Sequence, residues 1–391
     1  MSTVSTYQRR AAPTLRASSN ATRDPLCAVA RAFLDGRPLP YAMRAVAALD
    51  WERTVARAEH ERLAPILYVA LRGGAAPAPV LARLRATWIA AERQHLVAAG
   101  QLRQIIAAFR RADIDTVILN GPALAADYYG DPALRPFVDL DLLVRRPHRH
   151  QALEVLLDLG YVNDNPARAL DRVPAVSLSP PAQSPQLPVD LHWECVGHSG
   201  ARRIAELAAE EVWSRTVPAT AWGDGARTLA PEDLLIYLGS NFAIHHTLAG
   251  ALWQLDLALV LERHRATLDW DAVAARARRW GAAGATYFAL RSLAEALGVA
   301  APTEVLNRLR PGTFRIAAID RLQRAAHDGL RLDYLIGVFM LDRSADIIRM
   351  LLSWLLPPPG GLRTRYDSRS LAAAYLAHYG RLARTVARAM I

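Results

Sequence analysis

Val138-Asp-Leu-Asp-Leu-Leu-Val144 is the stretch of this chain that decides the fold, and a second stretch, Val189-Asp-Leu-His-Trp193, completes it. Both have the apolar composition of buried β-strands, interrupted by acids. Because side chains alternate between the two faces of a strand, Asp139 and Asp141 point the same way, about 6.5 Å apart along the strand. The apolar residues between them face the core. The pattern therefore predicts two short strands that each carry acids on one face.

Acids on one face of an apolar strand are costly unless positive charge lies between them. Mg²⁺, or Mn²⁺ in its place, meets this need because it prefers carboxylate oxygens and substrate phosphates. Asp190 on the second strand provides a third acid. Three such carboxylates favour a site for two metal ions that assist phosphoryl or nucleotidyl transfer. The alternative for Asp139 and Asp141 is a solvated edge strand, which needs no ion.

The bulk composition narrows the class of protein. The chain has 391 residues, of which 52% are hydrophobic and 21% charged, as is ordinary for a globular protein of two or three domains. Its formal net charge is +10, which permits an anionic partner, and it contains no lysine. A lysine Schiff base and a lysine phosphate clamp are therefore excluded. Arginine must bind any phosphate, a task that its planar fork suits.

The cysteines and the apolar stretches bear on localisation. Cys27 and Cys195 have no metal-type spacing, which favours a reducing cytoplasm. Residues 1–23 contain no acid and no apolar signal segment, so we expect a disordered tail, although a transit peptide has a similar composition. The most apolar later stretches, 234–261 and 334–356, are interrupted by charged residues. They predict buried helices and no membrane span.

The periodicity of the chain predicts an α/β (α+β) fold, in which a small mixed sheet is flanked by helical regions. Residues 24–113 and 223–391 carry apolar residues at three- and four-residue spacing, so we expect an N-terminal helical region and a C-terminal helical domain there. Residues 114–222 form the expected core, since they contain both acidic stretches.

A glycine turn precedes the first acidic strand. Asp115-Thr-Val-Ile-Leu119 is a β-branched run typical of a buried strand, and Asn120-Gly-Pro122 then opens a helix through about Tyr129. The positive end of such a helix can hold a triphosphate through its free backbone N–H groups. Strand, glycine turn, helix and acidic strand together predict a nucleotide site.

These motifs, in this order, resemble a family of uncharacterised nucleotidyltransferases of bacterial biosynthetic clusters, within the polymerase-beta-type nucleotidyltransferase superfamily. The Asp-x-Asp strand alone is a weak signal, whereas the ordered set of four motifs is strong. The matching stretches are Leu119 to Ala125, Arg135, Asp139 to Val144, and Asp190 to Trp193. Later segments that also fit are Asn241 to His246, Trp253 to Ala258, and Leu268 to Trp270.

The resemblance implies a mixed-sheet nucleotidyltransferase core that moves a nucleoside monophosphate from an NTP to an acceptor and releases pyrophosphate. The acceptor would be a small molecule, a peptide or a protein. It also implies that Asp139 and Asp141 bind both metal ions. Asp190 would bind the catalytic ion and orient the acceptor, acting as its base. His192, on the same strand face as Asp190, would touch the acceptor or a metal-bound water.

The resemblance assigns the nucleotide to Asn120, Gly121 and Arg135. Gly121 would let the phosphates approach the backbone, and Arg135 would contact phosphate. His245 and His246 are candidates for the acceptor side. For each of these two histidines, a satisfied buried histidine is the alternative.

The chain departs from the family pattern at the glycine turn. The family lysine is Asn120 here, and Pro122 removes an N–H donor where superfamily members have Gly-Ser or Gly-Gly. These losses favour an alternative, a non-catalytic homologue that binds a peptide or protein partner. The charge of +10 also permits an RNA-directed enzyme, but no stripe of aromatic and basic residues supports a nucleic-acid partner.

Overall fold

The structure, a computed structural model, describes residues 25–36, 50–73, 76–164, 170–194, 209–327, 333–357 and 370–390, together with 359, 362 and 366. The predicted tail over residues 1–23 and Cys195 lie outside this part of the chain, so the interpretations that rest on them stay predictions. Within the described residues, no helix is long and apolar enough to cross a membrane.

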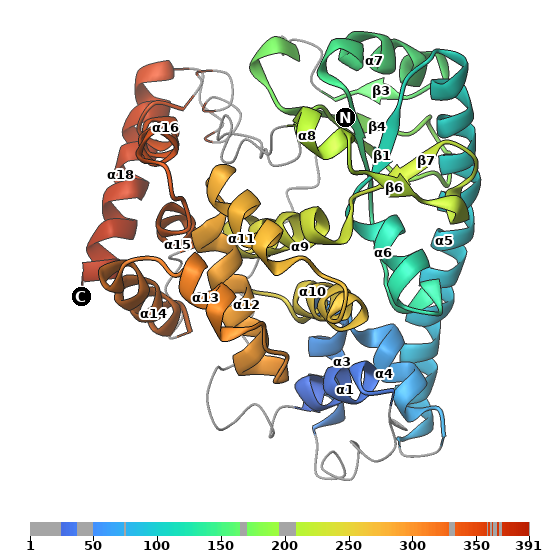
Figure 1. Cartoon of the computed structure of the whole chain (residues 1–391), viewed down its shortest axis with the longest axis horizontal. Coiled ribbons are helices and arrows are strands. Elements are labelled where there is room, and N and C mark those ends of the chain that lie inside the picture. Colours follow the sequence, from blue (N-terminus) through green and yellow to red (C-terminus); the bar gives the residue numbers. More distant parts are fainter. Residues whose placement is uncertain are drawn as a thin grey trace.

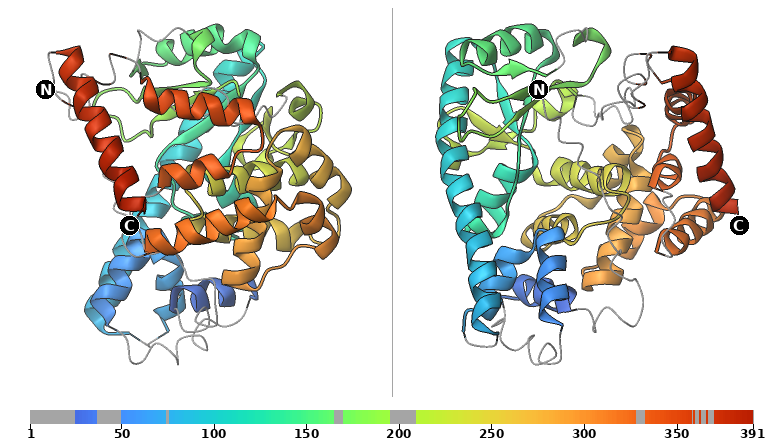
Figure 2. Two further views of the ribbon diagram at one scale, coloured as in Figure 1. Left: turned by 90° about the vertical axis from the view of Figure 1, so that its left-hand side faces the viewer. Right: turned by 180° about the vertical axis from the view of Figure 1, so that it is seen from behind.

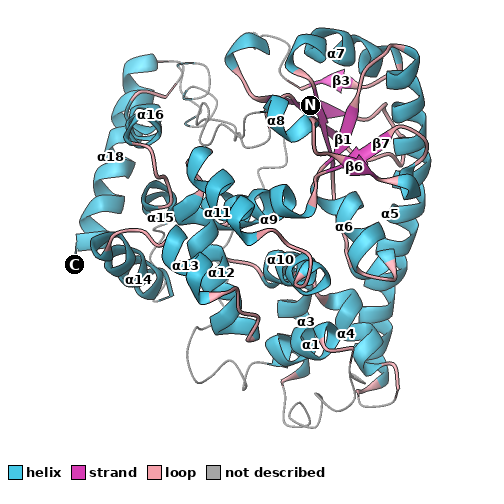
Figure 3. Cartoon of the chain, viewed as in Figure 1, coloured by secondary structure: helices cyan, strands magenta, loops and turns pink. Residues whose placement is uncertain are grey.

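A seven-stranded mixed sheet confirms the predicted α+β fold (Figure 3). β2 pairs in parallel with β5, and β1 with β7, whereas the other neighbours are antiparallel. The sheet reaches Thr228, beyond residue 222 where the sequence suggested that the core ends. The strands lie in the spatial order β3 (Val162–Asn163), β4 (Ala175–Ser179), β5 (Val189–His192), β2 (Leu140–Val144), β1 (Thr116–Ile118), β7 (Ala226–Thr228) and β6 (Val217–Pro218).

The two faces of the sheet pack into two apolar clusters. Leu142 and Leu191 belong to the cluster that includes α5 (Ala78–Arg111) and α7 (Arg149–Asp158). In Figure 1, α5 runs along the whole side of the molecule that carries the sheet. Val117 and Leu143 belong to the second cluster, which contains the remaining helices of the core. Because neighbouring strand residues alternate between these clusters, the sheet is covered on both faces.

Helices from both ends of the chain share the second cluster. α1 packs against α10 and α12, so a helix that precedes the sheet lies beside helices that follow it (Figure 2). The N-terminal helices are α1 (Pro25–Leu34), α3 (Trp51–His60) and α4 (Ala64–Leu71). Those after the sheet are α9 (Pro231–Ser240), α10 (Ala251–His264), α11 (Trp270–Arg279), α12 (Ala283–Leu297), α13 (Thr303–Leu309), α14 (Thr313–His327), α15 (Asp333–Phe339), α16 (Ser344–Leu355) and α18 (Leu371–Met390). Two further helices, α6 (Asn120–Tyr128) and α8 (Ala209–Trp213), connect strands of the sheet.

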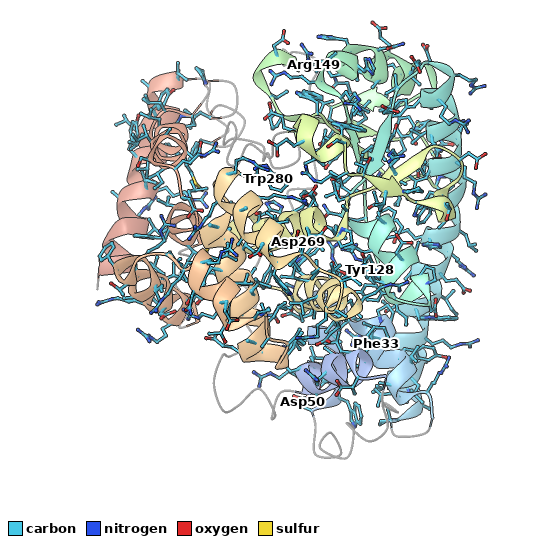
Figure 4. All side chains as sticks on the ribbon, in the orientation of Figure 1. Phe33, Asp50, Tyr128, Arg149, Asp269 and Trp280 are labelled. Carbon is cyan, nitrogen blue, oxygen red and sulfur yellow. The ribbon has the colours of Figure 1, made fainter. Side chains whose placement is uncertain are left out.

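Local sequence signals explain where several helices begin and end. Asp50 and Asp269, both labelled in Figure 4, cap α3 and α11 by accepting backbone N–H bonds of 3.1 and 2.9 Å. Gly160 follows α7 with a φ of 89°, the left-handed conformation that a helix-ending glycine adopts. These three residues therefore account for the start of α3 and α11 and for the end of α7.

Candidate active site

Two parallel strands bring the acidic residues together. In the pairing of β2 with β5, Asp141 lies opposite Asp190, and Leu143 lies opposite His192. One ligand atom from each of Asp141, Asp190 and His192 lies within 4.8 Å of the other two. Burial of the apolar residues that alternate with them fixes the register, because a slip by one residue would turn the acids into the core.

Two side-chain bonds hold the carboxylate of Asp141. His192 Nε2 lies 3.0 Å from Oδ1, and Asn120 Nδ2 donates to Oδ2 at 2.9 Å. Burial opposes the ionisation of Asp141, but the bonds from His192 and Asn120 outweigh it and lower its pKa. Asp141 is therefore ionised at neutral pH.

Asp139 precedes the strand instead of belonging to it. β2 begins at Leu140, so the strand predicted from Val138 was too long, and Asp139 lies in the bend before it. Burial raises the pKa of Asp139 to about 7, and the negative charges of Asp141 and Asp190 contribute to the rise. Mutual repulsion of this kind is relieved when a divalent cation binds.

Asp190 and His192 complete what we call the acidic group, which consists of Asp139, Asp141, Asp190 and His192. Burial raises the pKa of Asp190, although the charge of His192 and a bond from Ser177 oppose the rise. Burial disfavours protonation of His192, but its bond to Asp141 and the surrounding acids raise its pKa. The other ring nitrogen of His192, Nδ1, is buried and finds no hydrogen-bond partner among the described residues.

The donor set fits a divalent cation. Ligand oxygens lie about 2.0–2.1 Å from Mg²⁺, so two of them are at most about 4.2 Å apart. The ligand atoms of Asp141, Asp190 and His192 lie within 4.8 Å of one another, so they need at most a small contraction to share one ion. Carboxylates suit both Mg²⁺ and Mn²⁺, and an imidazole ligand favours a transition metal such as Mn²⁺. Asp139 lies outside this set of ligand atoms, so its part in binding two ions stays a prediction.

Comparison with known protein families tests the family resemblance independently of the structure. The sequence profile of a family described as uncharacterised nucleotidyltransferases matches residues 47–298. The chain belongs to this family. The matched range covers α3 to α12 and the whole sheet, and it confirms the resemblance that the motifs suggested. Nucleotidyl transfer, with an NTP as substrate, is the activity that the family implies. A search among curated proteins finds no match.

We use the term nucleotide side for Asn120, Gly121 and Arg135, the residues predicted from the sequence to bind the nucleotide. Asn120 is the first residue of α6. Its φ of 49° lies in the left-handed region, which asparagine tolerates better than most residues. Its Nδ2 donates at 2.9 Å to the hydroxyl of Tyr237 on α9, in addition to its bond to Asp141. The amide of Asn120 therefore positions a carboxylate of the acidic group.

Gly121 is required for packing. A Cβ at this residue would lie 2.6 Å from Cβ of Phe137 and 2.8 Å from Nη1 of Arg135. This close approach explains the glycine without a ligand, and its contact with phosphate stays a prediction. Pro122, also in the first turn of α6, removes no intrahelical bond, because N–H groups there have no helical partner.

Arg135 lies in the interior. Its side chain is 2% exposed and pairs with Asp256, which is 1% exposed, through Nη2–Oδ2 and Nε–Oδ1 distances of 2.7 and 3.2 Å. The hydroxyl of Tyr129 donates to the same carboxylate at 2.7 Å, and the Arg135 guanidinium lies 5.4 Å from the centre of the Trp253 ring. The predicted contact of Arg135 with phosphate therefore finds no support in this geometry, although its charge helps to lower the pKa of Asp141.

His245 and His246 lie at the π-helical turn Asn241–His245 that follows α9. Asn241 Nδ2 donates to Asn120 Oδ1 at 3.5 Å, and the His246 ring stacks on Trp253 at a centroid distance of 4.1 Å. Such π-helical turns are frequent at functional sites. The structure thus brings this turn beside the nucleotide side, while the acceptor role of the two histidines stays a prediction.

Two residues near the acidic group escaped the sequence analysis. Tyr237 holds Asn120 from α9, a contact that no local pattern reveals. Arg62 lies in the turn between α3 and α4, and its charge lowers the pKa of Asp139. The sequence signal at Arg62 is that the residues after α3, Glu61-Arg-Leu63, contain no glycine, although glycine is common where a helix ends.

Proposed function

We propose that this nucleotidyltransferase moves a nucleoside monophosphate from an NTP to a small-molecule, peptide or protein acceptor, with divalent cations held by Asp141 and Asp190 next to Asp139. The observation that carries the proposal is the parallel register that sets Asp141 opposite Asp190. It gathers acids from two strands beside the start of α6, and family membership connects that arrangement with nucleotidyl transfer.

The residues of the acidic group have separate roles in the proposed transfer reaction. The acceptor oxygen attacks the α-phosphorus, the bond from that phosphorus to the oxygen bridging to the β-phosphate breaks, and pyrophosphate leaves. Asp190 takes the proton of the acceptor, a role that its raised pKa favours. His192 and Asn120 keep the carboxylate of Asp141 in one orientation. When bound, Mg²⁺ or Mn²⁺ neutralises charge on the phosphate oxygens.

Incubation of the protein with each α-labelled NTP, Mg²⁺ or Mn²⁺ and candidate acceptors tests the proposal, with self-labelling measured in parallel. We expect labelled acceptor and free pyrophosphate, and a loss of about 10²- to 10⁴-fold in rate for Asp190→Asn. Asp158→Asn, which changes an exposed acid at the end of α7, is the matched control and should retain full activity.

Thermal unfolding tests binding separately from turnover. A metal ion and an NTP together should raise the unfolding temperature of the wild-type protein, and Asp141→Asn should abolish the rise. An equal rise in Asp141→Asn would contradict the assignment of the metal to the acidic group.

The second candidate function is a non-catalytic homologue that binds a peptide or protein partner. The observation that favours it is the internal use of two residues of the nucleotide side, since Asn120 bonds Asp141 and Tyr237 while Arg135 is buried against Asp256. If the protein is such a homologue, no NTP with Mg²⁺ or Mn²⁺ should raise its unfolding temperature. The same thermal experiment therefore decides between the two functions.

A further inference from the structure

Exposed apolar residues are concentrated on the last two helices, α16 and α18. Among the described residues, seven of the thirteen large hydrophobic side chains that are exposed lie between residues 348 and 379. Single exposed hydrophobic residues are common on protein surfaces, whereas a continuous group of them marks a surface that binds a partner. We call this group the exposed apolar face, which consists of Ile348, Leu351, Leu352, Leu355, Leu356, Leu376 and Tyr379.

The inner side of α16 determines which of its residues face outward. Ile347 and Met350 pack in a small apolar cluster with Ile244 of the π-helical turn. The exposed residues of α16 follow one another at spacings of three and four, so they line another side of the helix. The sequence predicted a buried helix over residues 334–356, but packing covers only part of the surface of α16.

Two hydrogen bonds join α18 to the end of α16. The hydroxyl of Tyr379 donates to Leu355 O at 2.7 Å, and the hydroxyl of Tyr375 donates to Pro357 O at 2.9 Å. The exposed apolar face therefore continues from Leu355 and Leu356 onto α18. In Figure 1, both helices lie at the edge of the molecule opposite α5, where a large partner can reach them.

The segment that carries this face is strongly basic. Residues 343–391 contain eight arginines and only two acidic residues, Asp346 and Asp367, so they carry a formal charge of +6 out of the +10 of the chain. Asp346 is buried, whereas Arg381 and Arg384 of α18 are exposed. Arginines around an exposed apolar helix face are typical of helices that bind the surface of an anionic membrane.

Charge also distinguishes between the partners that this face could bind. A second copy of the chain would bring the same positive charge to the contact, and like charges facing each other oppose association. A nucleic acid offers phosphates, but it offers no apolar phase into which leucine side chains can transfer. An anionic bilayer offers both, because its phosphates lie directly above its acyl chains.

We propose that α16 and α18 dock on the surface of a membrane that contains anionic lipids. The exposed apolar face enters the boundary between headgroups and acyl chains, and exposed arginines such as Arg384 pair with lipid phosphates. The inference does not rest on the proposed transfer reaction, and both helices lie beyond residue 298, where the family match ends. Because α16 packs on Ile244 beside the nucleotide side, docking fixes the orientation of the candidate active site relative to the bilayer.

Flotation of the full-length protein with lipid vesicles tests the proposal. We expect the wild-type protein to float with vesicles made of equal parts phosphatidylcholine and phosphatidylglycerol, and to bind phosphatidylcholine vesicles at least about tenfold more weakly. The double variant Leu352→Gln, Leu355→Gln should bind the mixed vesicles about 10- to 100-fold more weakly, because two leucines no longer transfer into the apolar boundary.

Two further variants sharpen the experiment. Leu96→Gln replaces a leucine of α5 that is 67% exposed, and this matched control should bind like the wild-type protein. Arg384→Gln should weaken binding to the mixed vesicles by about fivefold and leave binding to phosphatidylcholine unchanged. Every variant changes an exposed side chain, so each should unfold at the wild-type temperature.

Three outcomes would overturn the proposal. The wild-type protein might float with neither kind of vesicle. The double variant Leu352→Gln, Leu355→Gln could float as well as the wild-type protein, in which case the exposed apolar face is not the docking surface. Analytical ultracentrifugation without lipid could show a dimer that the same double variant dissociates, which would assign the face to a second copy of the chain.

Discussion

The acidic group and the nucleotide side are joined by the hydrogen bond from Asn120 to Asp141, but different forces hold them in place. In the acidic group, backbone pairing of β2 with β5 sets Asp141 opposite Asp190. On the nucleotide side, side chains fix each residue: Tyr237 holds Asn120, Phe137 packs on Gly121, and Asp256 pairs with Arg135. Tyr237 and Asp256 come from helices far along the sequence. Strand pairing fixes where the side chains of the acidic group lie relative to one another. The residues of the nucleotide side are held by bonds to other side chains, so they can stay in place while serving a structural role instead of binding a ligand.

The largest expected effect comes from breaking the Arg135–Asp256 pair. Asp256→Asn leaves a buried guanidinium without its counter-charge, so we expect the free energy of unfolding in urea to fall by about 3–5 kcal/mol. Glu59→Gln, which breaks the exposed pair of Glu59 with Arg83, is the control and should change it little. Similar changes in both variants would show that burial does not hold the nucleotide side together.

Gly121→Ala tests whether packing explains the glycine. The new Cβ would lie 2.6 Å from Phe137 Cβ, so we expect a loss of about 1–3 kcal/mol in unfolding free energy. Gly100→Ala on α5 meets no atom within 4 Å and should instead stabilise the protein by about 0.5–1 kcal/mol. If Gly121→Ala leaves the free energy of unfolding unchanged, packing does not explain the glycine. The phosphate contact predicted from the sequence would then be the better explanation.

The pH dependence of metal binding tests the acidic group. Because the pKa of Asp139 is raised to about 7, Mg²⁺ must displace a proton below that pH. We expect Mg²⁺ affinity in calorimetric titrations to rise about tenfold per pH unit up to about pH 7 and then to level off. Asp139→Asn should flatten this profile. If the Mg²⁺ affinity of Asp139→Asn still rises steeply with pH, the displaced proton comes from a group other than Asp139.

The metal-free protein should show the opposite trend in stability. A carboxyl with a raised pKa binds more protons when folded, so the unfolding free energy falls as pH rises from the ordinary carboxyl pKa of 3.8 through about 7. His192, whose pKa is also raised, acts in the same direction above pH 6.5. The lowered pKa of Asp141 stabilises the folded protein by a constant amount above its ordinary value of 3.8 and loses this contribution only at lower pH, so it does not cancel the trend.

The smallest expected effect concerns the hydrogen bond from Asn120 to Tyr237, which holds the amide that also donates to Asp141. Tyr237→Phe removes one acceptor of the Asn120 amide, so we expect less than about a tenfold loss in transferase rate, with the fold intact. If Tyr237 acts through Asn120, the double variant Tyr237→Phe, Asn120→Ala should lose no more activity than Asn120→Ala alone. Additive losses would mean that Tyr237 acts on the substrate by another route.

The sequence predicted some of these features and missed others for physical reasons. The acids on β2 and β5 and the helix α6 follow from local patterns, the alternation of side chains along a strand and the start of a helix, and the structure confirms them. The position of Asp139 in a bend was missed because alternation does not mark the residue at which strand pairing begins. The burial of Arg135 was missed because Asp256 lies on α10, far along the chain.

By itself, the sequence determined that Asp141 and Asp190 would each lie between apolar residues on a strand after a glycine turn, since backbone geometry alone turns neighbouring side chains to opposite faces. Only the tertiary structure decided which strand lies beside which and that Asn120 would hold Asp141. Those arrangements arise when distant segments pack into one core, because the free energy of burial selects partners that spacing along the chain does not encode.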